Sequence, residues 1–326
     1  MAETFPELND NLFGEKLNRF CADRFPARTF LLNQFNSLRA NNLNINTSQG
    51  KIYVGKDGWL FNTENLLRTD LPTTETLIKE LMLRQMMCKQ LGVKCLFVII
   101  PHKFKVYPEF VENQNIFKGI GLGDSLMSNA PKKLNIIYLK ETMLVRPDKN
   151  ELFYKGDHHW TYHGAFLGYN KILDYLSIPK FLKKSDFKKI TVPKSDLSLW
   201  RKMGITNQIE LDQAWFNTKY TDELNLQIQI MQREWNKEEW KNVPYIINTS
   251  NSSGKRVLIL RDSYTNKLAP FLANDFSELQ LLWDDWKYQF PEKILKENES
   301  KFTAQIANDN SEGQIVLSGK TQDLEK

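Results

Sequence analysis

The chain has 326 residues, of which 41% are apolar, and its formal net charge of +5 at pH 7 comes from 44 basic and 39 acidic side chains. This length suits one large α/β domain with additions, or two domains, and the apolar content excludes a chain that is disordered throughout. Because the sequence contains neither a dense basic run nor a nucleic-acid-binding motif, nucleic acid is not expected as a partner.

The first 48 residues are expected to form a helical arm. Apolar residues recur at helical spacing in the segments 12–20 and 30–38, and Pro26 between them breaks the first helix. Residues 1–8 lack a charged region followed by an apolar one, so no signal peptide is expected in this chain. That pattern leaves two alternatives, a cytoplasmic protein or one trimmed of its leader.

The α/β domain is predicted to begin with a hairpin and a helix. Residues 51–61 form two apolar stretches around a Lys-Asp-Gly turn, which is typical of a hairpin. Residues 73–91 show helical periodicity, with threonine available as N-cap and Gly92 as C-cap.

A buried strand follows at residues 93–100, and its continuous apolar run is typical of a parallel sheet. Lys103 comes directly after it, at the edge where open α/β sheets place their sites. A further strand is predicted at residues 135–139.

Residues 155–163 hold three of the four histidines and provide a candidate base. Asp157 lies two residues before His159, so an acid that can orient the imidazole stands beside it. Thr161 then begins a helix that ends near Pro179.

Residues from about 180 to 243 are predicted to be an insertion before the next strand. They are rich in Lys, Gln and Asn, carry tryptophans at 200, 215 and 235, and show weak periodicity. Exposed aromatic side chains here would suit stacking on sugar faces, whereas a packing subdomain is the alternative interpretation.

The candidate nucleophile is Ser263. The apolar run 256–260 stops at Arg-Asp-Ser-Tyr, and helical periodicity resumes through Leu272, so the serine stands where a buried strand gives way to a helix. An Asp-Ser pair in this place is also a common helix N-cap. Together with the acid and base at Asp157 and His159, however, it completes a candidate triad.

Another short strand is expected at residues 279–283, and the polar segment 298–326 is expected to be a disordered tail. The predicted organisation is therefore a helical arm at 1–48, an α/β domain at 49–297 and this tail.

A metal site is the second interpretation of the histidine segment. His159 and His163 are four residues apart and, with Asp157, would supply two imidazoles and a carboxylate. A zincin would carry Glu where Trp160 stands, and the sequence offers no further ligand cluster. The favoured prediction therefore has no metal and no cofactor.

The chain resembles the SGNH-hydrolase-like proteins of alginate O-acetylation, also called DHHW proteins after the Asp-His-His-Trp motif at 157–160. The resemblance spans roughly residues 5–290. It extends to blocks in the same order: Asp-Arg-Phe-Pro-Ala-Arg at 23–28, Gly-Lys-Asp-Gly-Trp-Leu-Phe at 55–61, Pro101, Lys103 and Val-Tyr-Pro-Glu at 106–109, Ser-Asp-Leu at 195–197, and Arg-Asp-Ser-Tyr at 261–264.

The resemblance implies a flavodoxin-like three-layer α/β fold with a mainly parallel sheet. By position it assigns the catalytic serine to Ser263 and the Asp-x-His pair to Asp157 and His159. The chain departs from many relatives in having Arg261 where they have Gly before Asp-Ser, and His158 is assigned no chemistry. Arg261, Tyr264 and Lys103 are expected to bind substrate or stabilise the oxyanion.

The function that follows is a serine-dependent O-acetyltransferase or acetylesterase acting on hydroxyls of a cell-surface or exported polysaccharide. The family implies a periplasmic or other extracytoplasmic location, with an anchor or leader absent from this chain, and a membrane-bound acyltransferase as the partner that supplies acetyl groups. The alternative is a non-catalytic carbohydrate-binding or scaffold protein of a polysaccharide modification complex.

Overall fold

The computed structural model describes residues 52–63, 73–90, 92–112, 121–180, 182–193, 197–203, 211–217, 245–249, 255–283, 304–306, 308–309 and 314–319. The helical arm predicted for residues 1–48 lies outside these ranges.

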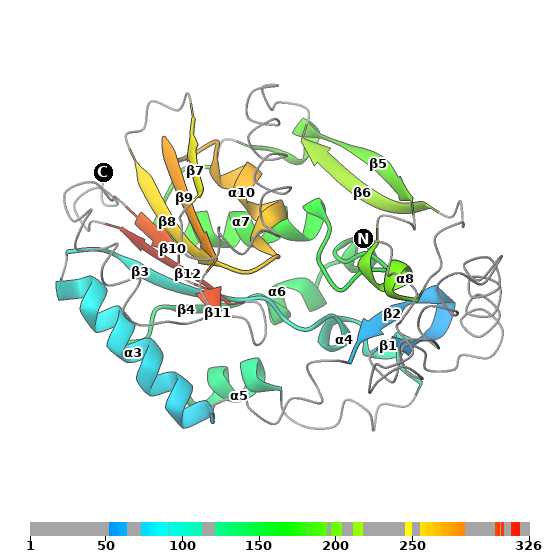
Figure 1. Ribbon diagram of the computed structural model, residues 1–326, viewed down its shortest axis with the longest axis horizontal. Helices are drawn as coiled ribbons and strands as arrows, with labels where there is room; N and C mark the ends of the chain where they lie inside the picture. The colour runs from blue at the N-terminus through cyan, green and yellow to red at the C-terminus, as the bar shows by residue number, and fades with distance from the viewer. Residues whose placement is uncertain are drawn as a thin grey trace, which may run out of the picture.

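A central sheet of eight strands organises the described residues (Figure 1). Five of them run parallel, in the order β4-β3-β10-β8-β9. Strands β7 and β12 run antiparallel to their neighbours, and β11 pairs with β12. The strands are β3 (Cys95–Ile99), β4 (Ile136–Tyr138), β7 (Tyr245–Asn248), β8 (Arg256–Arg261), β9 (Glu278–Trp283), β10 (Ala304–Ile306), β11 (Asn308–Asp309) and β12 (Gln314–Gly319).

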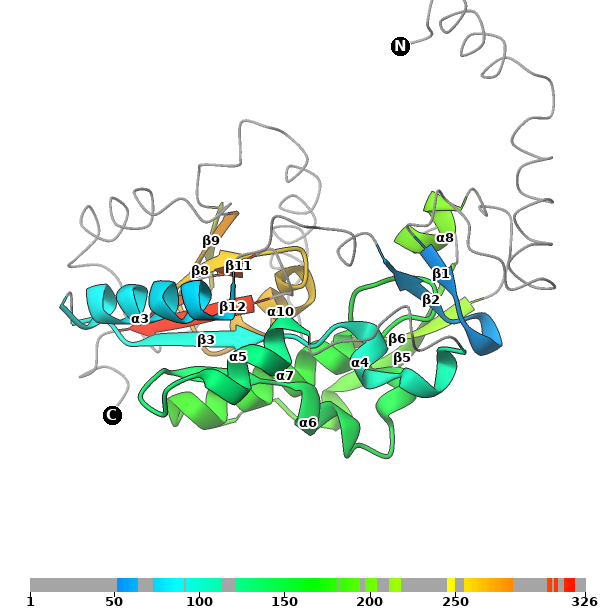
Figure 2. The ribbon, with the colours of Figure 1, turned by 90° about the horizontal axis from the view of Figure 1, so that it is seen from below.

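Helices cover both faces of the sheet and give the molecule three layers. Helix α3 (Thr74–Gln90) lies on one side, and α7 (Tyr162–Leu176) and α10 (Thr265–Leu272) on the other (Figures 1 and 2). Alternate residues of β3 enter the two cores: Leu96 and Val98 pack with α7 and α10, whereas Phe97 and Ile99 pack with α3 and α5 (Leu122–Asn129). The continuous apolar run of this strand is thus buried on both faces, as predicted.

The helix ends follow the capping signals of the sequence. Thr73 Oγ1 accepts from the Thr76 N–H, and Gly92 after α3 has a φ of +67°. Thr161 Oγ1 accepts from Gly164 N at the start of α7.

Two antiparallel hairpins lie outside the central sheet. Strands β1 (Ile52–Val54) and β2 (Leu60–Asn62) surround the predicted Lys-Asp-Gly turn, where Asp57 and Gly58 both have positive φ. Strands β5 (Phe187–Pro193) and β6 (Leu211–Asn217) pair within the predicted insertion, with α8 (Ser198–Lys202) between them in sequence. The remaining short elements are η2 (Lys56–Gly58), α4 (Lys103–Val106), η4 (Pro108–Phe110), α6 (Lys140–Leu144), η6 (Lys149–Glu151) and η7 (Lys184–Asp186).

Helix α8 packs on the β1–β2 hairpin near the histidine segment (Figure 2). A small separate core joins Leu60 of the hairpin, Tyr154, and Leu199 and Trp200 of α8. Trp200 is 1% exposed, so the suggestion that it offers a surface for sugars is wrong.

The described residues of the segment 298–326 differ from the predicted disordered tail, because they form β10, β11 and β12 and join the central sheet. Strand β12 contains the short apolar run Ile-Val-Leu at 315–317 and pairs antiparallel with the buried strand β3. A strand that gains ladder hydrogen bonds on a buried neighbour can form despite polar flanking sequence.

The structure thus shows a three-layer α/β fold with a mixed sheet. The flavodoxin-like arrangement of the strands stays a prediction. Within the described residues, none of the helices is long and apolar enough to cross a bilayer.

Candidate active site

The Asp-His-His-Trp motif lies in a loop that folds back on itself before α7. Phe153 and Trp160 form an isolated antiparallel bridge, and Thr161 N donates to Leu152 O at 2.8 Å. The ends of the loop are therefore fixed, and the residues between them turn toward the sheet edge.

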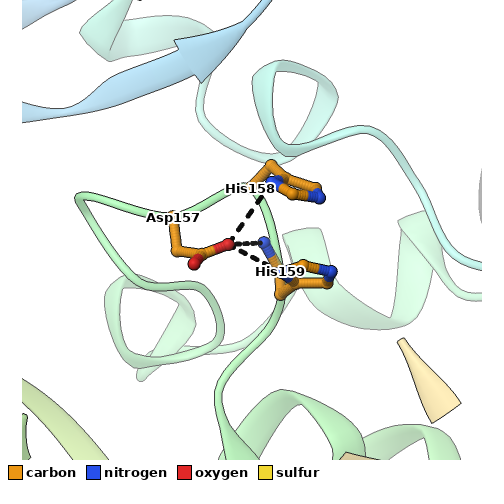
Figure 3. Close-up of side chains that lie close together, drawn as sticks. All are labelled: Asp157, His158 and His159. Carbon is orange, nitrogen blue, oxygen red and sulfur yellow. Dashed lines mark hydrogen bonds and ion pairs between the residues drawn. The ribbon is translucent and has the colours of Figure 1, made fainter. Parts of the chain in front are cut away.

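Asp157 is the centre of this loop (Figure 3). Its Oδ1 accepts from the backbone N–H of His159 at 2.9 Å and lies 2.7 Å from His159 Nδ1. Its Oδ2 accepts from the backbone N–H of Ser198 at 2.7 Å. Burial alone would raise the pKa of this carboxyl, but His159 and His158 hold that pKa well below its usual value. The group therefore stays ionised at neutral pH.

Ser263 reaches the same place from the other end of the chain. It follows β8 and precedes α10, and its Oγ lies 2.6 Å from His159 Nε2. The structure thus brings together the three residues that the sequence singled out, in the order Asp157, His159, Ser263.

Two reciprocal hydrogen bonds join the histidine loop to the serine turn. Trp160 Nε1 donates to Tyr264 O at 2.9 Å, and the Tyr264 hydroxyl donates to His158 O at 2.8 Å. Gly168 leaves room for the buried indole, because a Cβ there would stand 3.0 Å from the Trp160 ring. The fourth residue of the motif thus positions the serine.

Helix α8 supports the loop through its first N–H groups. Leu199 N and Trp200 N donate to Gly156 O, while Ser198 N donates to Asp157 Oδ2. These groups have no partner within a helix, so the loop satisfies them. Gly156 is required because a Cβ there would come within 1.8 Å of the Trp200 ring.

Lys103 does not have the free ammonium expected of a substrate-binding residue. It is 2% exposed, and its Nζ donates to the carbonyls of Leu60, Tyr154, Lys155 and Asp157 at 2.5–3.0 Å. Its ammonium therefore fixes the histidine loop to the β1–β2 hairpin.

Arg261 and Tyr264 also have structural contacts. Arg261 is fully buried, its Nη1 donates to Asp262 O and to Asn266 Oδ1, and burial lowers its pKa well below the usual value. The hydroxyl of Tyr264 is bonded to the histidine loop. Direct contact of these two residues with a substrate stays a prediction.

The backbone N–H groups of the serine turn differ in their hydrogen bonds. Tyr264 N donates to Asp262 Oδ1 at 2.8 Å, and Thr265 N donates to Asp262 O. Among the hydrogen bonds between described residues, none uses the N–H of Ser263 itself. The N–H of Ser263 is therefore the donor that this turn leaves for another partner.

The metal set that joined His163 to Asp157 and His159 differs from the observed contacts. His163 Nε2 lies 3.1 Å from Asp148 Oδ2, and its Nδ1 lies 3.5 Å from Glu151 Oε2. His158 stands beside Asp157 instead, with its Nδ1 3.4 Å from Oδ1. Burial, and then the charge of His159, keeps the pKa of His158 well below its usual value.

A model of the family described as "SGNH hydrolase-like domain, acetyltransferase AlgX" matches residues 52–226, more than half of the chain. The chain belongs to this family. The match contains Asp157 and His159 and ends before Ser263, so the AlgX-family model does not itself reach the serine.

Solved structures similar to this AlgX-family chain include Bacillus cereus PatB1 with a sulfonyl adduct, at 16% identity and a TM-score of 0.51, covering 77% of this chain and 93% of that one. The O-acetyltransferase domain of Pseudomonas putida AlgJ matches at 17% identity and a TM-score of 0.45, with 77% and 86% covered. The PatB1 likeness supports the fold. No curated protein matches the sequence.

Sequence reasoning missed the N–H of Ser198 as a partner of Asp157 and the anchoring role of Lys103. The only signal for the first was the Ser-Asp-Leu block at 195–197 that precedes α8, since side-chain oxygens and acidic groups favour helix starts. The partners of Lys103 are backbone carbonyls, which leave no mark in the sequence.

Proposed function

We propose that the protein is a serine-dependent O-acetyltransferase or acetylesterase that acts on hydroxyls of a cell-surface or exported polysaccharide through an acetyl-serine. One observation carries the proposal: a continuous hydrogen-bonded path from Asp157 Oδ1 through His159 to Ser263 Oγ, with steps of 2.7 and 2.6 Å. The chain belongs to an acetyltransferase family, which indicates that the transferred acyl group is acetyl.

In the first half-reaction, Ser263 Oγ attacks the acetyl carbonyl of the donor while its proton passes to His159 Nε2. Asp157 keeps the other ring proton on Nδ1 and stabilises the imidazolium. The tetrahedral intermediate then collapses, the leaving group takes the proton from Nε2, and an acetyl ester remains on Ser263.

The N–H of Ser263 is the donor that this turn offers to the oxyanion. It lies at the entry to α10, where the partial positive charge of a helix start favours negative charge. Asp262 Oδ1 accepts a hydrogen bond from the Tyr264 N–H and so holds the turn in this conformation.

In the second half-reaction, a sugar hydroxyl gives its proton to His159 Nε2 and attacks the carbonyl of the acetyl-serine. The tetrahedral intermediate then breaks its bond to Ser263 Oγ, which takes the proton back from Nε2, and the acetyl group leaves on the sugar. Water in place of the sugar would make the protein an acetylesterase. We infer a polysaccharide acceptor, an extracytoplasmic location and a membrane-bound acyltransferase that supplies acetyl groups, because these follow from the family rather than from the site.

The proposal is tested with p-nitrophenyl acetate and with intact mass after a short incubation. The native protein should release p-nitrophenol and gain one acetyl group, and Ser263→Ala and His159→Ala should each lower kcat by at least about 10³-fold. Ser128→Ala is the matched control, because Ser128 lies on α5, where its hydroxyl bonds to Asp124 O.

Acetyl labelling of Ser263→Ala at another serine would contradict the proposed nucleophile. A native protein that binds acetylated glycan but neither hydrolyses it nor forms an adduct would favour the scaffold alternative.

A further inference from the structure

The strongest unassigned feature is the cluster of ligand atoms around Asp157 Oδ1 (Figure 3). Asp157, His158 and His159 each contribute one oxygen or nitrogen, and these atoms all lie within 4.8 Å of one another. Figure 3 shows both imidazoles with one ring nitrogen near the carboxylate and the other directed away from it. His158 has no role in the proposed acyl transfer, and its Nδ1 lies 3.2 Å from Ser198 Oγ and 3.4 Å from the carboxylate.

We propose that Zn²⁺ binds at Asp157 Oδ1, His158 Nδ1 and His159 Nδ1 and inhibits acyl transfer. This inference rests on the proposed function, since it regulates the same site. Two imidazoles and one carboxylate are common zinc ligands, and a tetrahedral ion with bonds of about 2.0–2.2 Å separates its ligand atoms by roughly 3.4 Å.

The observed separations are close to that geometry. His158 Nδ1 is already 3.4 Å from Asp157 Oδ1, and His159 Nδ1, at 2.7 Å, would need to move by less than 1 Å. The His158 and His159 side chains are 27% and 21% exposed and that of Asp157 is 11% exposed, so the cluster lies close to the protein surface. Water would complete the coordination.

Binding of the ion changes the tautomer of His159. In the triad, Nδ1 carries the proton and Nε2 is free to accept one from Ser263. When Nδ1 bonds to Zn²⁺ in place of a water ligand, its proton leaves to solvent and another is taken up at Nε2, so the imidazole stays neutral. A protonated Nε2 cannot act as the base for Ser263, and the acylation step stops.

This role differs from that of a catalytic metal. An ion in this position would engage the groups that orient the base. Zinc binding at this cluster and proton transfer through Asp157 and His159 therefore exclude one another, and zinc should lower the rate of acyl transfer.

The test combines calorimetric titration with ZnCl₂, hydrolysis of p-nitrophenyl acetate with and without ZnCl₂, and ¹⁵N NMR of the His159 ring. The native protein should bind one ion at this cluster, lose at least about 90% of its rate at saturation and recover it with EDTA. The NMR signal should show the proton moving from Nδ1 to Nε2. MgCl₂ should have no effect, since Mg²⁺ prefers oxygen ligands.

Two variants make the outcome specific. His158→Gln should weaken zinc binding by at least about tenfold, because even outer partners of metal ligands are worth about 10- to 100-fold in affinity. Each protein is compared with itself, with and without zinc, and circular dichroism checks that the variant folds. Ser263→Ala should bind zinc as the native protein does, because the serine is not a ligand.

The results separate the two proposals. Zinc binding that His158→Gln weakens, in a native protein without esterase activity, would retain the metal site and overturn the proposed function. Esterase activity unaffected by zinc, or accelerated by it, would overturn the metal inference alone. An unchanged affinity in folded His158→Gln would place the ion elsewhere and also overturn it.

Discussion

Asp157 shows how single atoms fix the site. Both carboxylate oxygens are in use, Oδ1 toward His159 and Oδ2 toward the start of α8. The carboxylate therefore cannot rotate away from the imidazole without losing a hydrogen bond to the backbone of Ser198. This second bond restricts the ring of His159 to the orientation that faces Ser263.

Asp262, one residue before the serine, gives a prediction of pH-dependent stability. Burial raises the pKa of its carboxyl to about 7, although the Tyr264 N–H and the charges of His159 and Arg261 oppose that rise. Between pH 4 and 7 the unfolded chain has lost this proton while the folded protein keeps it, so rising pH weakens folding. Asp262→Asn removes the titration and keeps an oxygen for the Tyr264 N–H.

The free energy of unfolding of Asp262→Asn minus that of the native protein should therefore increase as pH rises from 4 to 7, by at most about 4 kcal/mol. Above pH 7 it should be constant. Urea unfolding at several pH values measures this difference, with exposed Asp57→Asn as the control for loss of one carboxylate. A difference that does not vary with pH would show that Asp262 ionises normally in the folded protein.

Among the elements, the short helix α8 contacts the histidine loop directly and helps to hold Asp157 in place. It is five residues long, and its first N–H groups bind Gly156 O and Asp157 Oδ2. Its tryptophan occupies the space that a side chain at residue 156 would need. The helix and the histidine loop can therefore pack only if residue 156 has no Cβ.

Gly156→Ala should separate α8 from the histidine loop. We expect a loss of about 1–3 kcal/mol in stability from overpacking, and a fall in kcat because Asp157 loses the Ser198 N–H. Gly92→Ala is the matched control. It strains a residue with φ of +67° at the end of α3 and costs about 1 kcal/mol, but it leaves the site intact.

Urea unfolding and p-nitrophenyl acetate hydrolysis measure both quantities in both variants. Loss of stability without loss of rate in Gly156→Ala would mean that α8 does not hold Asp157 in place.

At the scale of the whole molecule, the sequence predicts what local patterns determine. Thr73 and Gly92 mark the ends of α3, and the Lys-Asp-Gly turn predicts the β1–β2 hairpin, because caps and turns depend on neighbouring residues. The acid, base and nucleophile are identifiable because each has a distinctive residue type beside a strand or helix end.

Features that depend on distant partners leave weaker signals. The four carbonyls that bind Lys103 come from two separate segments, and the N–H of Ser198 has no side-chain signature. Strand β12 pairs with β3 more than 200 residues earlier, and its short apolar run is easily read as part of a polar tail. Tertiary contacts therefore decide these cases.

Strand β12 supports the last prediction. It pairs with β3 at four positions, Leu96 to Ile99, and with β10 at two. A chain ended after Glu297 loses β10, β11 and β12, and the β3 backbone loses its partners there. We expect the free energy of unfolding to fall by at least about 3 kcal/mol, since each hydrogen bond contributes about 1 kcal/mol.

A chain ended after Gly319 keeps all three strands and should retain native stability. Urea unfolding compares the three lengths, and amide hydrogen exchange at Leu96 and Val98, which are paired with Leu317 and Ile315, reports on the β3–β12 ladder directly. Ile315→Pro, which removes the N–H opposite Val98, should reproduce part of the loss without shortening the chain. If the Glu297 chain is as stable and as protected at β3 as the native protein, residues 298–326 form no part of the sheet, and the disordered tail that their composition favours is correct.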